Sequence, residues 1–170
     1  MTIIVETGAG ITSSNSYVSR ADYITYAATV GITIASNDDA DVQLIKAQEY
    51  IAAHEDNLIG DKVDRDQSIS YPRHNLYIEG FSWDSDEIPK QVISCQLAYA
   101  IDLNSGEDLY NREANPTQIV TKEKIEGAVE VEYSAPSSNT QKLSKSSTGD
   151  ALLASLLKTN SFMSIPLVRA

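Results

Sequence analysis

Few side chains in this sequence have the types and spacing that metal chemistry requires. The two histidines, His54 and His74, have no cysteine, histidine or carboxylate at a spacing typical of a zinc site. Asp61, Asp64 and Asp66 form a small acidic cluster, but they lack the closer alternation, the glycine and the terminal glutamate of a calcium loop. We therefore expect no metal site, and we expect these residues to lie in solvated loops or at the surface.

The patterns of phosphate binding and nucleophilic catalysis are also incomplete. Gly8-Ala9-Gly10 has no third glycine at the dinucleotide spacing, and no Lys-Ser/Thr pair follows at the P-loop spacing. No Gly-x-Ser-x-Gly is present. Cys95 lies in the apolar stretch 92–101 with no histidine nearby in sequence, which favours a buried structural thiol. The sequence predicts no catalytic residue, no cofactor and no enzymatic activity.

A cluster of aromatic residues near a cation raises the question of nucleic-acid binding. Tyr71-Pro72-Arg73 together with Tyr77 resembles the stacking platforms of single-strand binders. The same region also carries seven carboxylates, at Asp61, Asp64, Asp66, Glu79, Asp84, Asp86 and Glu87. We therefore favour core packing and interface contacts for the aromatic residues, and Tyr71, Pro72 and Arg73 are candidate partner contacts. Single-stranded-DNA binding remains the alternative.

The charge is distributed unevenly along the 170 residues, whose net charge is −11. Residues 1–117 hold seven Lys/Arg and nineteen Asp/Glu, whereas residues 118–170 hold six and five. An acidic body argues against tight, sequence-independent binding of nucleic acid, which needs Lys and Arg to neutralise phosphates. It suits a soluble protein, or a surface past which DNA slides.

Three helices are predicted in the first two thirds of the chain. Ser19 is a candidate N-cap for a helix over 19–30, and acidic residues favour the start of a second helix over 39–55. Pro89 opens a third, over 88–103, that is apolar nearly all round. The polar stretch 57–87 between the second and third helices is expected to be loop-like.

The last third of the chain changes character. Apolar and acidic residues alternate over 129–133, which predicts a strand paired with 119–124. A Leu-rich helix is expected over 151–158, with Asp150 as its cap. The fold class is therefore mainly α, with a small helical bundle body and a β-hairpin or extended arm, followed by a C-terminal helix plus tail. The corresponding divisions are a body 1–117, a hairpin arm 118–134, a flexible linker 135–149 and a C-terminal helix and tail 150–170.

Apolar side chains are concentrated after the Ser-rich linker. We expect them to be covered in the working state, either on the chain's own body or on a partner, and we favour the partner. The candidate contact residues are Leu152, Leu153, Leu156, Phe162, Ile165, Leu167, Val168 and Arg169.

Targeting signals and disulfides are not predicted. The N-terminus has no basic region and only a short apolar run, and no stretch reaches the roughly 18 apolar residues of a membrane span. A single cysteine cannot form an internal disulfide. We therefore expect a soluble protein, made in a cytoplasm and without membrane contact.

Several short motifs follow one another along the chain. They are Asn15-Ser16-Tyr17-Val18-Ser19, Lys46-Ala47, Tyr50-Ile51, Gln67 to Arg73, Ile88-Pro89, Val92, Leu97-Ala98, Gly127, Val129–Tyr133, Ala151-Leu152-Leu153 and Ile165–Arg169. Their order resembles that of the head–tail connector (adaptor) proteins of tailed bacteriophages, whose members are often labelled DnaT-like single-stranded-DNA-binding proteins. The resemblance covers nearly the whole chain. Where that family has tryptophan before the Pro-Arg pair, this chain has Tyr71, and its glycine-rich loop is reduced here to Gly60.

The resemblance implies a structural virion protein at the head–tail interface. Such adaptors form a homo-oligomeric ring, commonly a dodecamer, that docks on the portal protein and receives the next tail or nozzle protein. DNA would pass through the channel during ejection without tight binding. The motifs are structural, so the resemblance implies no catalytic residue.

Overall fold

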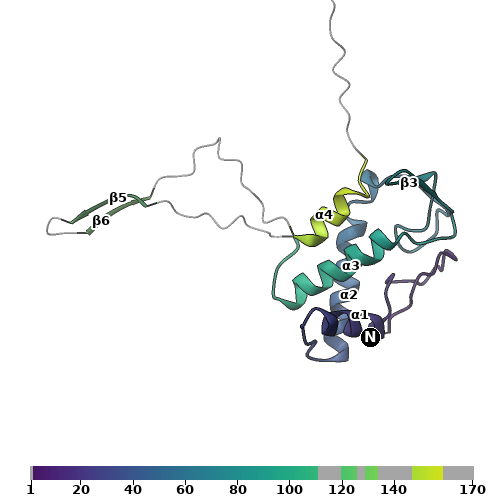
Figure 1. Ribbon diagram of the computed structural model, residues 1–170, viewed down its shortest axis with the longest axis horizontal. Helices are drawn as coiled ribbons and strands as arrows, with labels where there is room; N and C mark the ends of the chain where they lie inside the picture. Colours follow the sequence, from purple (N-terminus) through teal and green to yellow (C-terminus); the bar gives the residue numbers. More distant parts are fainter. Residues whose placement is uncertain (1, 111–119, 126–128, 134–146, 159–170) are drawn as a thin grey trace, which may run out of the picture.

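The computed structural model describes residues 2–110, 120–125, 129–133 and 147–158. This part of the chain contains four α-helices. They are α1 (Arg20–Thr29), α2 (Asn37–Ala52), α3 (Lys90–Asn104) and α4 (Thr148–Ala154). Helix α3 lies at the centre, with α4 on one side and α1 on the other (Figure 1).

Serine side chains begin three of these helices. Ser19 and Ser36 each accept a hydrogen bond from a backbone N–H of the first turn, that of Asp22 and that of Asp39. Ser147 forms a reciprocal capping box with Asp150, so α4 begins at Thr148, before the predicted start at 151. A polar cap satisfies N–H groups that the helix itself cannot. The three long predicted helices are confirmed, with shifts at their ends.

The core is formed where α3 packs against α2 and α4. Leu44 and Ile51 of α2 meet Val92 and Tyr99 of α3, and all four are fully buried. Each such side chain contributes about 1.5–3 kcal/mol on burial. Gln96 is also fully buried; it accepts from Tyr17 N (2.9 Å) and donates to Ser16 Oγ and to Leu44 O, both at 2.9 Å.

The segment between α2 and α3 is not the loop that its polarity suggested. It contains the 3-10 helix η1 (Glu55–Asn57) and four short strands, which pair as two antiparallel sheets. The first sheet joins β1 (Asp61–Lys62) to β2 (Arg73–His74), and the second joins β3 (Leu76–Ile78) to β4 (Phe81–Trp83).

These strands correct the predicted fold class, because the described chain is mixed α/β rather than a mainly helical bundle. The alternation was present but short: Leu76 and Ile78 are buried and Tyr77 between them is exposed. Glu79 and Gly80 make the tight turn with φ of 53° and 88°. Two or three residues are too few for a period-2 pattern to stand out in a sequence.

The predicted arm is present as a hairpin of β5 (Val120–Ile125) and β6 (Val129–Tyr133). Its strands pair antiparallel with Ile125 opposite Val129 and Lys124 opposite Glu130, and the register is irregular between Val120 and Lys122. The predicted turn at 126–127 and most of the predicted linker lie outside the described residues.

Helix α4 packs onto the chain's own body. Leu153 is 4% exposed and Leu156 is fully buried. Leu156 O accepts from Ile59 N at 2.9 Å, and Lys158 N donates to Asn57 O at 2.7 Å. No helix among the described residues has the length and apolar character needed to cross a membrane.

Candidate nucleic-acid interface

The tripeptide Tyr71-Pro72-Arg73 lies inside the body. Tyr71 is fully buried, Arg73 is 5% exposed and Pro72 is also buried. The ring of Tyr71 packs edge-on against Tyr17, with 6.2 Å between centroids, and Tyr71 N donates to the Tyr17 hydroxyl. Burial raises the pKa of the Tyr71 hydroxyl above its ordinary value. This tripeptide therefore anchors its segment to the helices and presents no ring for base stacking.

The Arg73 guanidinium is held by the same packing. It lies 5.8 Å from the centre of the Tyr71 ring and donates to Ser70 O and Gly60 O, at 3.3 and 2.9 Å. These bonds tie β2 to the segment before β1. A cation so enclosed cannot reach a phosphate without opening the structure.

The remaining candidates for metal or nucleophilic chemistry have structural surroundings. Within the described residues, no group of three or more His, Cys, Asp or Glu side chains could hold a metal ion. Asp64 accepts from Asp66 N at 2.8 Å within its own turn. Cys95 is buried, its Sγ lies 3.6 Å from Gly149 O, and burial raises the pKa of the thiol to about 12. Such a thiol stays protonated at neutral pH and is a poor nucleophile.

A buried carboxylate shapes the N-terminal loop. Glu6 is 2% exposed and accepts hydrogen bonds from Gly8 N, Gly10 N and Ile11 N at 2.9, 3.0 and 2.6 Å. Gly8 has a φ of 107°, and a Cβ there would collide with Asp86 O. The backbone N–H groups of the predicted tight turn therefore donate to the Glu6 carboxylate, so they are not available to bind a phosphate.

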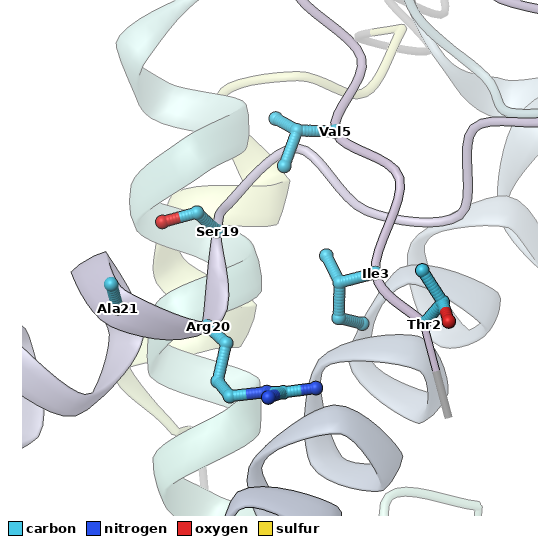
Figure 2. A pocket seen from close by; sticks show the side chains of 6 residues that line it. All are labelled: Thr2, Ile3, Val5, Ser19, Arg20 and Ala21. Atoms are coloured by element: carbon cyan, nitrogen blue, oxygen red, sulfur yellow. The ribbon is translucent and has the colours of Figure 1, made fainter.

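An open groove of about 310 Å³ lies between the N-terminal segment and the start of α1. Figure 2 shows Ile3 and Val5 on one side of it and Ser19 and Arg20 on the other. The Arg20 guanidinium is bound to the Asp41 carboxylate by bonds of 2.6 and 2.5 Å and holds the pKa of that carboxyl below its usual range. The cation of this groove is thus already neutralised, so the groove offers little to an anion.

A cluster of aromatic rings extends to the surface near the C-terminal end of α2. The Tyr50 ring contacts His54, Tyr99 and Tyr110, with centroid distances of 5.0, 4.8 and 5.4 Å, each edge to face. Tyr110 is 63% exposed, Tyr50 and His54 are half-buried, and Tyr99 is fully buried. The rings therefore form a contiguous row from the buried Tyr99 to the exposed Tyr110, and Tyr110 packs against Tyr50.

A lysine and a histidine flank Tyr50 at four-residue spacings. Lys46 is exposed and lies one turn before Tyr50 on α2, whereas His54 follows just beyond the end of α2. His54 Nδ1 is 2.9 Å from Tyr50 O and donates its hydrogen to that carbonyl. We call Lys46, Tyr50, His54 and Tyr110 the α2 stripe. The four-residue spacing was visible in the sequence, but the contribution of Tyr110 depended on the fold.

The C-terminal contact residues predicted from sequence are only partly described. Leu153 and Leu156 are buried in the chain's own core and Leu152 packs against it, which corrects the preference for a partner over this stretch. The reason is local: the capped helix places both leucines against α3 and η1. Phe162, Ile165, Leu167, Val168 and Arg169 lie outside the described residues.

Comparison with known proteins places the chain in a family. A family model described as "Putative DnaT-like ssDNA binding protein" matches residues 1–170. The chain belongs to this family. No curated protein and no solved structure matches the chain.

The family match overturns the resemblance to phage head–tail connectors. The matched family is described by single-stranded-DNA binding, and nothing in the match concerns a connector. The prediction of a portal-binding adaptor ring that serves DNA ejection from a virion is therefore wrong. The motifs behind it are structural, as Tyr71 and Arg73 illustrate, and structural motifs do not by themselves carry a function. The partners and the location implied by that resemblance lose their support with it.

Proposed function

We propose that the protein binds single-stranded DNA, through base stacking on the α2 stripe. The observation that carries this is the combination of the exposed Tyr110 ring, which packs on Tyr50, with a lysine and a histidine four residues either side of Tyr50. Unpaired bases of any identity stack on such rings, and cations nearby contact the phosphates. Membership of a family described as DnaT-like and single-stranded-DNA-binding supports the same conclusion.

The charge of the body sets the strength of binding. Residues 1–117 hold nineteen Asp/Glu against seven Lys/Arg, and most of the protein surface therefore repels phosphates. Stacking, worth about 1–3 kcal/mol per base, must supply most of the free energy. We expect micromolar affinity with a shallow dependence on salt, since few counterions are released.

Fluorescence anisotropy with a labelled oligo(dT) tests the proposal. Tyr110→Ala should weaken binding at least about fivefold, since it removes one stacking surface. Tyr77→Ala is the matched control, because Tyr77 is 64% exposed and Tyr110 is 63% exposed but the two lie on different elements. The control should bind within about twofold of the natural protein. A duplex of the same length should bind more weakly, because its bases are already stacked.

Two results would contradict the proposal in distinguishable ways. Absence of oligo(dT) binding at 100 μM protein and low salt would reject the function itself. Binding that Tyr77→Ala abolishes and Tyr110→Ala leaves intact would keep the function and reject the α2 stripe as its site.

A further inference from the structure

The β3–β4 hairpin exposes two large aromatic side chains. Phe81 is 73% exposed and Tyr77 is 64% exposed. The hairpin itself is fixed, because Leu76 and Ile78 are buried and Gln91 Nε2 donates to Glu79 Oε2 at 3.3 Å. Aromatic rings held rigidly in water form a favourable surface for an apolar partner.

The charged side chains of the hairpin segment itself are all of one sign. Between His74 and Lys90 the chain has no Lys or Arg, and the residues Glu79, Asp84, Asp86 and Glu87 are all exposed. We call Tyr77, Phe81 and these four carboxylates the acidic hairpin surface. Carboxylates at this density repel phosphates, so this surface is unsuited to nucleic acid. It favours an apolar segment that carries positive charge.

The hairpin also offers hydrogen-bonding edges. Its sheet consists of β3 and β4 alone, so each strand has one edge without a strand partner among the described residues. An extended segment can add to such an edge through its backbone, while its side chains contact the exposed rings.

The chain's own C-terminal segment has the complementary composition. Residues 159–170 contain no Asp or Glu and carry one cation, Arg169. Their large apolar side chains are Phe162, Met163, Ile165, Leu167 and Val168.

The point where this segment begins lies near the hairpin. Lys158 N donates to Asn57 O, and Leu157 bridges to Leu58. A few residues further on, Gly60 O accepts from Arg73, which lies in β2 shortly before β3. Figure 1 shows the end of α4 and β3 at the same end of the molecule. Extended, residues 159–170 could span at most about 40 Å, at 3.3–3.6 Å per residue.

We propose that segment 159–170 docks on the acidic hairpin surface of its own chain. Its apolar side chains cover Tyr77 and Phe81, and Arg169 lies among the carboxylates. A short tether gives the segment an effective concentration in the millimolar range, which favours the chain's own hairpin over that of a second copy. The proposal is independent of DNA binding, since the α2 stripe is a different surface.

Trp83, the single tryptophan, lies half-buried on β4 and reports on this surface. In the full-length protein, the double variant Phe162→Asp/Leu167→Asp should release the segment. We expect acrylamide quenching of Trp83 to increase about twofold, and amide hydrogens of 76–83 to exchange at least about tenfold faster. The double variant Val30→Asp/Val42→Asp is the control, since it adds the same charge at two other apolar positions, 48% and 39% exposed. It should leave both readouts unchanged.

A charge exchange tests the role of Arg169. Arg169→Glu alone should increase the quenching of Trp83, and Asp84→Arg combined with Arg169→Glu should restore it. Unchanged quenching and exchange in Phe162→Asp/Leu167→Asp would overturn the proposal. So would a Trp83 signal that changes between 1 and 100 μM protein, because protection would then come from the segment of a second copy.

Discussion

The ring of Tyr71 holds the strand-bearing segment onto the helices. It is fully buried against Tyr17, and its hydroxyl has no hydrogen-bond partner among the described atoms. Tyr71→Ala should therefore lower the free energy of unfolding by about 3–5 kcal/mol, as for other buried aromatic side chains. Tyr71→Phe should change it by less than about 1 kcal/mol, since no bond is lost. Urea denaturation measures both, and equal losses in the two variants would show that the hydroxyl matters.

The Arg20–Asp41 pair predicts a pH-dependent part of the stability. The Arg20 side chain, by its hydrogen bond, holds the pKa of Asp41 below the ordinary value of a carboxyl group, and the Asp41 side chain is fully buried. A lowered folded-state pKa means that this stabilisation is present above the unfolded pKa of about 3.9. It is lost as the pH falls through the folded-state value.

Arg20→Gln should accordingly destabilise the protein at pH 7 and much less at pH 2.5. Urea denaturation at the two pH values measures the change. Arg65→Gln is the control: Arg65 is 96% exposed, 4.0 Å from Asp66, and its loss should matter at neither pH. A deficit in Arg20→Gln that is the same at both pH values would contradict the ion-pair explanation.

Residue types alone predicted that Cys95 is buried and that Tyr71 anchors a loop, and both side chains are buried in the structure. They did not predict that Arg73 turns inward. That orientation depends on two carbonyls outside the strands: Gly60 O just before β1 and Ser70 O shortly before β2, in a sheet of only two-residue strands. Of the α2 stripe, only Lys46, Tyr50 and His54 share a spacing that the sequence itself shows. Tyr110 comes from another part of the chain, so its place in the stripe depends on the fold.

Helix α4 belongs to the folded body, which makes the position of a truncation informative. A chain ending at Ser147 loses Leu153 and Leu156, and it also loses the Tyr99–Asp150 hydrogen bond of 3.0 Å. It should be about 3–6 kcal/mol less stable than a chain ending at Lys158, at 1.5–3 kcal/mol per buried leucine. Thermal and urea unfolding of the two chains test this. Equal stability would mean that α4 does not contribute to the core.

Element boundaries were predictable where a local signal fixed them. Ser19 begins α1 as expected, because a serine cap needs only its neighbours. The cap of α4 was placed on Asp150 although Ser147 forms it, since in a capping box both residues carry suitable oxygens. The docking of α4 on the chain's own body was the less favoured of the two alternatives for this stretch. It requires that Gly149 bring the helix against the Tyr99 ring, where a Cβ would come within 2.5 Å.

At the scale of the whole molecule, the acidic charge was read directly from the sequence, and it limits any DNA affinity. The family was not read correctly, because the ordered motifs largely mark core and cap positions. Tyr17, Val92 and Leu153 are such positions, and they are buried whichever partner the protein binds. The surfaces that we propose for binding use exposed groups instead, such as Tyr110 and Phe81, which packing does not dictate.

The described residues that flank the segment carrying β5 and β6 pack against the same pair of aromatic rings, Tyr50 and Tyr99. The chain departs after Tyr110, whose ring rests on Tyr50, and it returns at Ser147, two residues before Gly149 meets the Tyr99 ring. Tyr50 and Tyr99 themselves touch, at 4.8 Å. Contacts within the body therefore hold Tyr110 and Ser147 in position, independently of the residues between them. Doubling the length of a closed loop costs only about 0.6 kcal/mol. A change of sequence or length between Tyr110 and Ser147, or a foreign module grafted there, should therefore leave the helical scaffold the same.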